Sequence, residues 1–263
     1  MTEPDWWRKA LTGAPLHADD DRVYFIETPA DAFADTQEEA SRHRWSRMRR
    51  SHYDWLAREL EILPTGQRMV DIGCGQSQFR DLVDRHYVCG IDFYPYPAAR
   101  VVTDLNRDLP LADSCCDIAI LSNVLEHIYE PRSLLAETGR ILQSGGRMLI
   151  VVPFFIKIHQ PPYDFFRYTN FALDRLCREA GFAEVRVEPL GNLFDTYELD
   201  RSVRARILRR ESAGPRRFAL RGLMWAERKC DAIVHRLLPR GVRESADRDG
   251  FPHSFAVHAV KAP

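Results

Sequence analysis

The middle of the chain alternates short apolar runs with segments of helical spacing. The apolar runs are "RMVDIG" (68–73), "YVCGID" (87–92), "CDIAILSN" (116–123) and "GRMLIVVPFF" (146–155). Runs of this kind are typical of parallel strands that are buried on both faces. Helical spacing is found at 76–85, 95–100, 131–142 and 170–181, and further strand patterns at 183–191 and 253–262. The pattern predicts an α/β fold on a mostly parallel sheet.

Two segments depart from this alternation. Residues 1–34 are irregular and aromatic, and a helix is expected to follow from Thr36, where Thr36 and Glu39 form a capping box, to about Pro64. Residues 200–250 hold fourteen Arg or Lys against seven Asp or Glu, with spacing that suits two amphipathic helices split by "SAGPRR". We therefore predict a strap and helix acting as a cap (1–64), a core (65–192 plus 251–263) and a basic helical insertion (193–250).

Composition excludes several classes of protein. The chain of 263 residues is 45% hydrophobic, with a net charge of -1, so no overall charge imbalance indicates a nucleic-acid partner. No apolar run approaches the roughly 20 residues of a membrane span, and the expected location is the cytoplasm. The six cysteines form no CxxC pair and no His/Cys ligand spacing, so the sequence predicts neither disulfides nor a metal site.

A glycine turn joins the first core strand to the helix pattern after it. In "VDIGCGQSQF" (70–79), Gly73 and Gly75 permit a sharp turn and a close approach of backbone to ligand. Asp71 precedes the turn, Asp92 ends the next strand and Asp104 lies in "VTDLNRDLP". A dinucleotide fingerprint would need a third glycine, and carboxylates disfavour a pyrophosphate. Three acids without a basic clamp favour a positively charged adenosine compound.

These residues together resemble a known family. Asp71-Ile-Gly73-Cys-Gly75, Asp92, Asp104-Leu105 and "NVLEHI" (123–128) are similar to the motifs of class I S-adenosylmethionine-dependent methyltransferases of the type-11 domain kind. The resemblance covers about 65–192 plus the last strand, and one departure is Ser77 where many members have a third glycine. It implies a Rossmann-like, mostly parallel seven-stranded sheet with helices on both faces, a helical insertion before the last strand, and S-adenosyl-L-methionine as cofactor.

The resemblance also implies roles for individual residues. The amino-acid end of the cofactor would be held by Asp71, Gly73, Cys74 and Gly75. Asp92 would bind the ribose, Phe93 would flank the adenine, Asp104 and Leu105 would contact the adenine edge, and Asn123 would lie near the sulfonium. Glu126 and His127 are expected to fix the loop after the strand.

A dense loop, "IKIHQPPYDFFRYT" (156–169), follows the next strand and is predicted to line the acceptor side. His159 is the candidate catalytic base, and the candidate acceptor-binding residues are Tyr163, Asp164, Arg167 and Tyr168. The alternative is that Asp164 and Arg167 pair and the loop only closes over the cofactor. "QPPY" (160–163) resembles a motif of amino-methyltransferases, but its position and first residue differ, which argues against methylation of nucleic acid.

The predicted function is O-methylation of a hydroxylated acceptor such as a glycan, a glycolipid or a related metabolite, because the loop resembles that of bacterial enzymes thought to act on sugars and polysaccharide precursors. Two alternatives stay open: methylation of a small aromatic or polyketide-like natural product, and an inactive cofactor-binding partner subunit. Asp71 and the missing third glycine oppose an NAD-dependent dehydrogenase. The basic insertion would bind an anionic carrier or a membrane surface peripherally, or act as a solvated lid or dimer contact.

Overall fold

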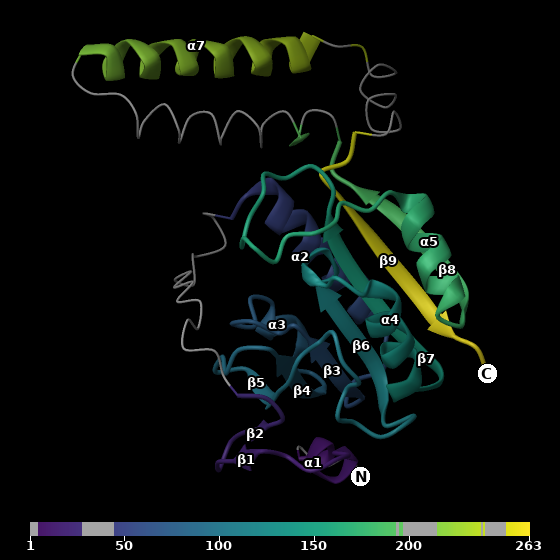
Figure 1. Cartoon of the computed structure of the whole chain (residues 1–263). Coiled ribbons are helices and arrows are strands. Elements are labelled where there is room, and N and C mark those ends of the chain that lie inside the picture. The colour runs from purple at the N-terminus through teal and green to yellow at the C-terminus, as the bar shows by residue number, and fades with distance from the viewer. Residues whose placement is uncertain (1–4, 28–44, 193–194, 197–214, 238, 240–250) are drawn as a thin grey trace.

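The computed structural model describes residues 5–27, 45–192, 195–196, 215–237, 239 and 251–263. Within these residues one sheet of nine strands has the order β1-β2-β5-β4-β3-β6-β7-β9-β8 (Figure 1). The strands are His17–Ala18 (β1), Val23–Tyr24 (β2), Arg68–Ile72 (β3), Tyr87–Asp92 (β4), Ala99–Val102 (β5), Cys116–Ser122 (β6), Leu142–Pro153 (β7), Phe182–Leu190 (β8) and Ser254–Lys261 (β9). Neighbours from β2 to β7 are parallel, whereas β1 and β9 are antiparallel to theirs. The predicted fold class is confirmed.

Helices of the described residues pack on both faces of this sheet, and one long helix lies apart from it (Figure 1). They are Trp6–Ala10 (α1), Arg47–Glu61 (α2), Arg80–Val83 (α3), a 3-10 turn Leu125–His127 (η2), Pro131–Ile141 (α4), Asn170–Glu179 (α5) and Pro215–Leu237 (α7). Proline at the first position suits the start of α4, and the Thr169 hydroxyl accepts from the Ala172 N–H at 3.2 Å to cap α5. These local signals explain why 131–142 and 170–181 were well predicted.

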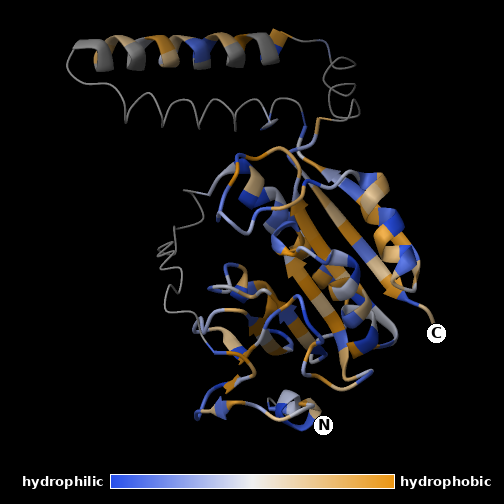
Figure 2. Ribbon diagram, in the orientation of Figure 1, coloured by the Kyte–Doolittle hydropathy of each residue, from blue (hydrophilic) through white to orange (hydrophobic). Residues whose placement is uncertain are grey.

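The core divides into two layers because side chains alternate along buried strands. On β6, Ala119 and Leu121 join the cluster under α4 and α5, whereas Ile118 and Ile120 join the cluster that contains Trp55 of α2. Figure 2 shows the central strands as the most hydrophobic part of the molecule. The sheet therefore packs against a hydrophobic cluster on each face, and this packing fixes the positions of the strand ends.

Three predictions about elements need correction. The segment 95–100 is not a helix. Strand β5 begins at Ala99 and pairs in parallel with β4, and it is too short to show the hydrophobic pattern of a strand in the sequence. The helix expected from Thr36 is described only from Arg47, where the Ser46 hydroxyl accepts from the Arg49 N–H at 3.1 Å with an extended Ser46 backbone. Thr36 and Glu39 lie outside the described residues. The helix expected at 76–85 is reduced to α3.

The described part of the amino-terminal segment packs at the end of the sheet where the strands begin. The Trp6 indole N–H donates to the Tyr87 carbonyl at 2.8 Å, at the first residue of β4. Trp7 is buried in the core, and β2 extends the sheet beside β5. Leu56 and Leu60 of α2 instead line the pocket described below. Within the described part of residues 1–64, α2 is thus the element that borders the site.

The described part of the insertion is α7, which Figure 1 draws apart from the sheet. Its apolar side chains include five large exposed ones: Phe218, Leu223, Trp225, Ile233 and Leu237. No helix in the described part of the chain is long and apolar enough to span a membrane. The first of the two helices predicted for the insertion, before "SAGPRR", lies outside the described residues.

Candidate active site

The glycine turn after β3 is tight and open to ligand. The N–H groups of Gly73 and Cys74 both donate to the Ile91 carbonyl of β4, at 2.7 and 3.1 Å. Gly73, Gly75 and Ser77 have φ values of +67°, +50° and +54°, a region that favours glycine. Ser77, which stands where many family members have a third glycine, thus adopts a glycine-like conformation. The turn predicted at this position is confirmed.

Substituting Gly73 by Ala tests this turn. A Cβ atom at Gly73 would lie 2.4 Å from Cγ2 of Val124, whereas one at Gly75 would have no atom within 4 Å. Steric overlap and positive φ together predict that Gly73→Ala lowers the free energy of unfolding by about 2 to 4 kcal/mol. Gly75→Ala, the matched control, should lose only about 1 kcal/mol, from φ alone. Urea unfolding of both variants measures the difference, and equal losses would contradict the predicted clash.

Asp92 at the end of β4 is held rigidly. Its carboxylate accepts from the Gly75 N–H at 2.8 Å and from the Tyr94 N–H at 3.0 Å. Only 8% of the residue is exposed, and this burial raises the pKa of Asp92 against the opposing effect of the backbone donors. Burial, together with the negative charge of Asp92, raises the pKa of Asp71 to about 7. Two close carboxylates of this kind attract a cationic ligand.

The raised pKa of Asp71 makes ligand binding depend on pH. At pH 6 the group is mostly protonated and at pH 8 mostly ionised, and only the ionised form attracts an ammonium group. Affinity for S-adenosylhomocysteine should therefore rise about tenfold from pH 6 to pH 8, in line with the ionised fraction. Asp71→Asn should flatten the profile in the same calorimetric titrations. An equally steep rise in Asp71→Asn would show that another group titrates.

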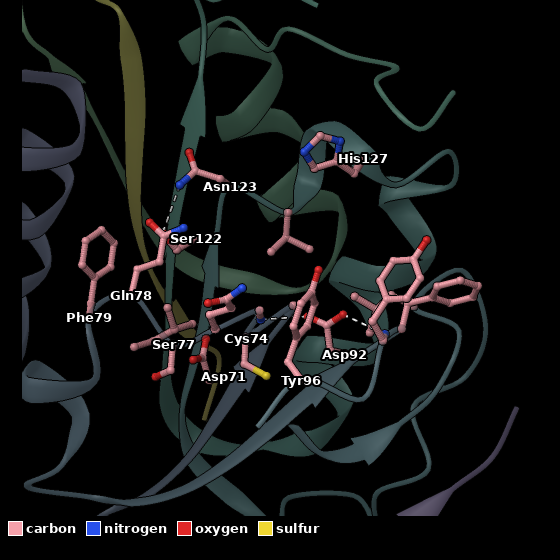
Figure 3. Close-up of a pocket in the computed structure, with 18 of the residues that line it drawn as sticks. Asp71, Cys74, Ser77, Gln78, Phe79, Asp92, Tyr96, Ser122, Asn123 and His127 are labelled. Carbon is pink, nitrogen blue, oxygen red and sulfur yellow. Dashed lines mark hydrogen bonds between the residues drawn. The ribbon is translucent and has the colours of Figure 1, made fainter. Parts of the chain in front are cut away.

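A cavity of about 290 Å³ joins these residues to the rest of the predicted cofactor set. All nine predicted cofactor residues line it: Asp71, Gly73, Cys74, Gly75, Asp92, Phe93, Asp104, Leu105 and Asn123. Figure 3 shows Asp71 and Asp92 near one end, and Asn123 and His127 toward the other. The described lining residues include three aspartates but no lysine or arginine. The charge pattern fits the sulfonium and ammonium groups of S-adenosylmethionine better than a pyrophosphate.

Of the residues predicted for the acceptor side, only Tyr163 lines this cavity among the described residues. Tyr163 lines it, together with Gln160 of the same loop. His159, Asp164, Arg167 and Tyr168 are not among the described lining residues. Asp164 and Arg167 pair through two contacts of 2.6 and 2.9 Å, and this pairing holds the pKa of Asp164 well below its usual range. The structure therefore contains the alternative that was left open, in which Asp164 and Arg167 form an ion pair inside the loop.

Tyr168 requires a correction. It was predicted to bind the acceptor, but only 6% of it is exposed, and its hydroxyl donates to the Leu125 carbonyl at 3.1 Å. Burial raises the pKa of this hydroxyl above its ordinary value. The side chain packs under the loop as part of the core because its hydroxyl finds a backbone partner there. Sequence alone does not separate an aromatic residue that supports a loop from one that faces its ligand.

His127 is the functional candidate that the sequence prediction assigned to a structural role. It lines the cavity, and its ring lies 4.7 Å from the ring of His159, centroid to centroid. Glu126 beside it is fully buried, which raises its pKa to about 8. Burial lowers the pKa of both His127 and His159 below the ordinary value, which favours the neutral form of both rings. A cluster of one carboxyl group and two imidazoles therefore borders the end of the cavity opposite Asp92.

Comparison with known proteins agrees with the predicted fold and with the predicted cofactor. Residues 70–150, from β3 into β7, match a family model described as a methyltransferase domain. This stretch of the chain is a methyltransferase domain, and the fold is that of S-adenosylmethionine-dependent methyltransferases. Among the solved structures that this chain resembles is an S-adenosylmethionine-dependent methyltransferase from Archaeoglobus fulgidus, with a TM-score of 0.52 and 17% identity, over 83% of this chain and 96% of that one.

Curated relatives match this chain only in part. A probable S-adenosylmethionine-dependent methyltransferase of Mycolicibacterium smegmatis is 26% identical over 125 residues, which is 43% of this chain and 47% of the relative. An uncharacterized 37.1 kDa protein in a transposon of Streptomyces fradiae is 28% identical over 178 residues, which is 55% of this chain and 51% of that protein. The chain thus spans about half the length of these curated relatives.

Proposed function

We propose that this chain is an S-adenosylmethionine-dependent methyltransferase that transfers the methyl group to an oxygen of a hydroxylated acceptor, such as a glycan, a glycolipid or a related metabolite. The observation that carries the proposal is the polarity of the cavity. Acidic residues surround one end, and His127 and Asn123 occupy the other (Figure 3). A cationic donor and a neutral acceptor that must lose a proton would fit these two ends in that order.

In this proposal the cofactor-side residues orient S-adenosylmethionine, and the acceptor-side residues align the acceptor and help it to lose its proton. When bound, S-adenosylmethionine supplies a methyl group on a sulfonium sulfur. Asp92, fixed by two backbone N–H groups, would accept hydrogen bonds from the ribose hydroxyls, and Asp71 would face the ammonium end. Methyl transfer is an in-line displacement, so the chain must mainly align the acceptor and exclude water. Tyr163 and Gln160 would form the wall that does so.

Loss of the acceptor proton is assigned to the cluster of Glu126, His127 and His159. Of these, His127 is the residue that lines the cavity, and its ring contacts that of His159. His159, the candidate base from the sequence, would thus act as part of a shared cluster. Neutral imidazoles beside a hydroxyl favour oxygen as the methylated atom, because an amine acceptor needs less help to lose its proton.

A labelled-methyl assay tests the proposal. The purified chain would be incubated with S-adenosylmethionine carrying a tritiated methyl group and with separate glycan, lipid and phenolic acceptor pools. Label is expected in the glycan or lipid pool, and Asp92→Ala should abolish its transfer. Label only in the phenolic pool would decide for a small aromatic or polyketide-like acceptor. Cofactor binding with no label in any pool would instead favour the partner-subunit alternative.

The insertion is proposed to attach the chain to anionic membrane surfaces from the cytoplasmic side. Within α7, Arg and Lys outnumber Asp and Glu by six to two, and Leu223 and Trp225 are exposed. We expect sedimentation with phosphatidylglycerol vesicles, weakened by salt and at least tenfold weaker for a Leu223→Ser, Trp225→Ser double variant. Ile62→Ser, which removes an exposed apolar side chain elsewhere, is the control. A wild-type chain that stays in the supernatant would contradict the membrane proposal.

A further inference from the structure

Three potential metal ligands converge at the acceptor end of the cavity. Glu126 and His127 lie in the turn after β6, and His159 lies in the loop after β7, the parallel neighbour of β6. One ligand atom from each side chain can be chosen so that all three lie within 4.8 Å of one another. The residues are far apart in the sequence, which is why ligand spacing along the chain gave no sign of a metal site.

The carboxyl group of Glu126 is buried without a hydrogen-bond partner. None of Glu126 is exposed, and neither of its side-chain oxygens has a hydrogen-bond partner. Nε2 of His127, 3.7 Å from Glu126 Oε1, is also buried and lacks a hydrogen-bond partner. A buried polar atom that lacks a partner costs about 1–3 kcal/mol, and more when it is charged. A cation between these groups would remove that cost.

The two imidazoles are oriented as ligands usually are. The Nδ1 side of His127 is hydrogen bonded to the Tyr163 carbonyl, and Nδ1 of His159 lies 3.2 Å from Asp164 Oδ2. In metal sites the non-ligating ring nitrogen typically faces a carbonyl or carboxylate in this way. The arrangement leaves both Nε2 atoms toward Glu126, with His159 Nε2 3.9 Å from Oε1. The pair of Asp164 and Arg167 would then position His159.

We propose that Glu126, His127 and His159 bind one divalent first-row transition-metal ion. Two imidazoles and one carboxylate suit zinc, manganese, cobalt or iron, and three protein ligands leave positions open for other oxygens. Metal–ligand bonds of about 2.1 Å imply ligand atoms about 3–3.5 Å apart. The separations of 3.7 and 3.9 Å to Glu126 Oε1 are slightly wider than this, and all three ligand atoms lie within 4.8 Å of one another, so side-chain rotations would have to bring them together around the ion.

The metal ion would activate the acceptor, and this part of the inference rests on the proposed function. An acceptor hydroxyl that enters an open coordination position becomes more acidic. With their Nε2 atoms on the ion, the two histidines would act through the metal and not as bases themselves. The proton of the acceptor then passes to water, the oxygen forms a bond to the methyl carbon, and the bond from that carbon to sulfur breaks. The sulfur keeps the electron pair, which yields S-adenosylhomocysteine. The cluster would thus lower the pKa of the acceptor and hold it beside Asn123.

Metal binding is tested on the untagged full chain after removal of metal with a chelator. Titration calorimetry and elemental analysis with zinc, manganese and cobalt salts should give close to one ion per chain for at least one of these metals. Glu126→Gln and His159→Ala should each weaken its binding at least tenfold. Glu130→Gln and His17→Ala, which change exposed side chains of the same types, should leave it unchanged. Circular dichroism would verify that every variant is folded.

Several results would overturn the inference. Less than about 0.1 ion per chain for all three metals, or equal affinity in wild type and Glu126→Gln, would exclude this site. Full methyl transfer in the chelated protein would exclude a catalytic role for the ion. If metal and S-adenosylhomocysteine both bind but no oxygen acceptor is methylated, the metal site stands and the proposed function fails. The two failures are thereby distinguishable.

Discussion

Replacing Asp92 by Ala is expected to weaken binding of S-adenosylhomocysteine at least tenfold. The carboxylate is rigid, since it accepts N–H donors from Gly75 and Tyr94 and is 8% exposed. Hydrogen bonds from a ligand to a charged group contribute about 1.5–3 kcal/mol, which corresponds to roughly a tenfold to hundredfold change in affinity. Titration calorimetry of wild type and variant measures the loss directly.

The control for this experiment separates ligand contact from support of the turn. Asp92→Asn retains an oxygen that can accept one of the two backbone bonds, so its thermal melt should lie closer to wild type than that of Asp92→Ala while affinity still falls. Asp108→Ala removes an exposed carboxylate of the same chemical type and should change neither quantity. An unchanged dissociation constant in Asp92→Ala would remove Asp92 from the ligand site.

Replacing His127 or His159 by Ala is expected to lower turnover by about a hundredfold or more, with cofactor affinity nearly intact. A group that accepts or removes a proton in the transition state contributes typically 10²–10⁴ in rate. His127 borders the cavity and His159 stands in ring contact with it, so the two substitutions should be far from additive in the double variant. Steady-state rates at saturating S-adenosylmethionine provide the measurement.

The two histidine variants also distinguish a shared cluster from a single base. If His127→Ala reduces turnover and His159→Ala does not, His127 acts alone and the loop residue only packs against it. If neither variant is slower, the cluster has no part in catalysis and the O-methylation proposal loses its chemical support. His17→Ala, on an exposed strand distant in sequence from the site, is the matched control for loss of an imidazole.

The cofactor end of the site could be predicted from the sequence because its signals are local. Gly73 and Gly75 require positive φ at a strand-to-helix turn, and Asp92 ends an apolar run, so each can be placed without knowing the rest of the fold. Parallel strands then bring their carboxyl ends to one edge of the sheet. The fold class followed from the same apolar runs.

The acceptor end could not be predicted to the same depth because its geometry is set by tertiary contacts. Tyr168 looks like a ligand-facing aromatic in sequence, but Leu125 offers its hydroxyl a buried partner. Glu126 becomes a candidate ligand only because the loop after β7 places Nε2 of His159 3.9 Å from its Oε1 atom. Strand β5 was missed for a related reason. Its four residues are buried by neighbouring elements, and they are too few to show a strand-like alternation of apolar and polar residues in the sequence.

The most direct test of the central claim is calorimetric titration of the purified chain with S-adenosylhomocysteine at pH 8. The account predicts one site per chain with a dissociation constant in the micromolar range, and a loss of at least tenfold in Asp92→Ala. The absence of any binding up to millimolar ligand would contradict the assignment of Asp71, Asp92 and Asp104 to a cofactor site.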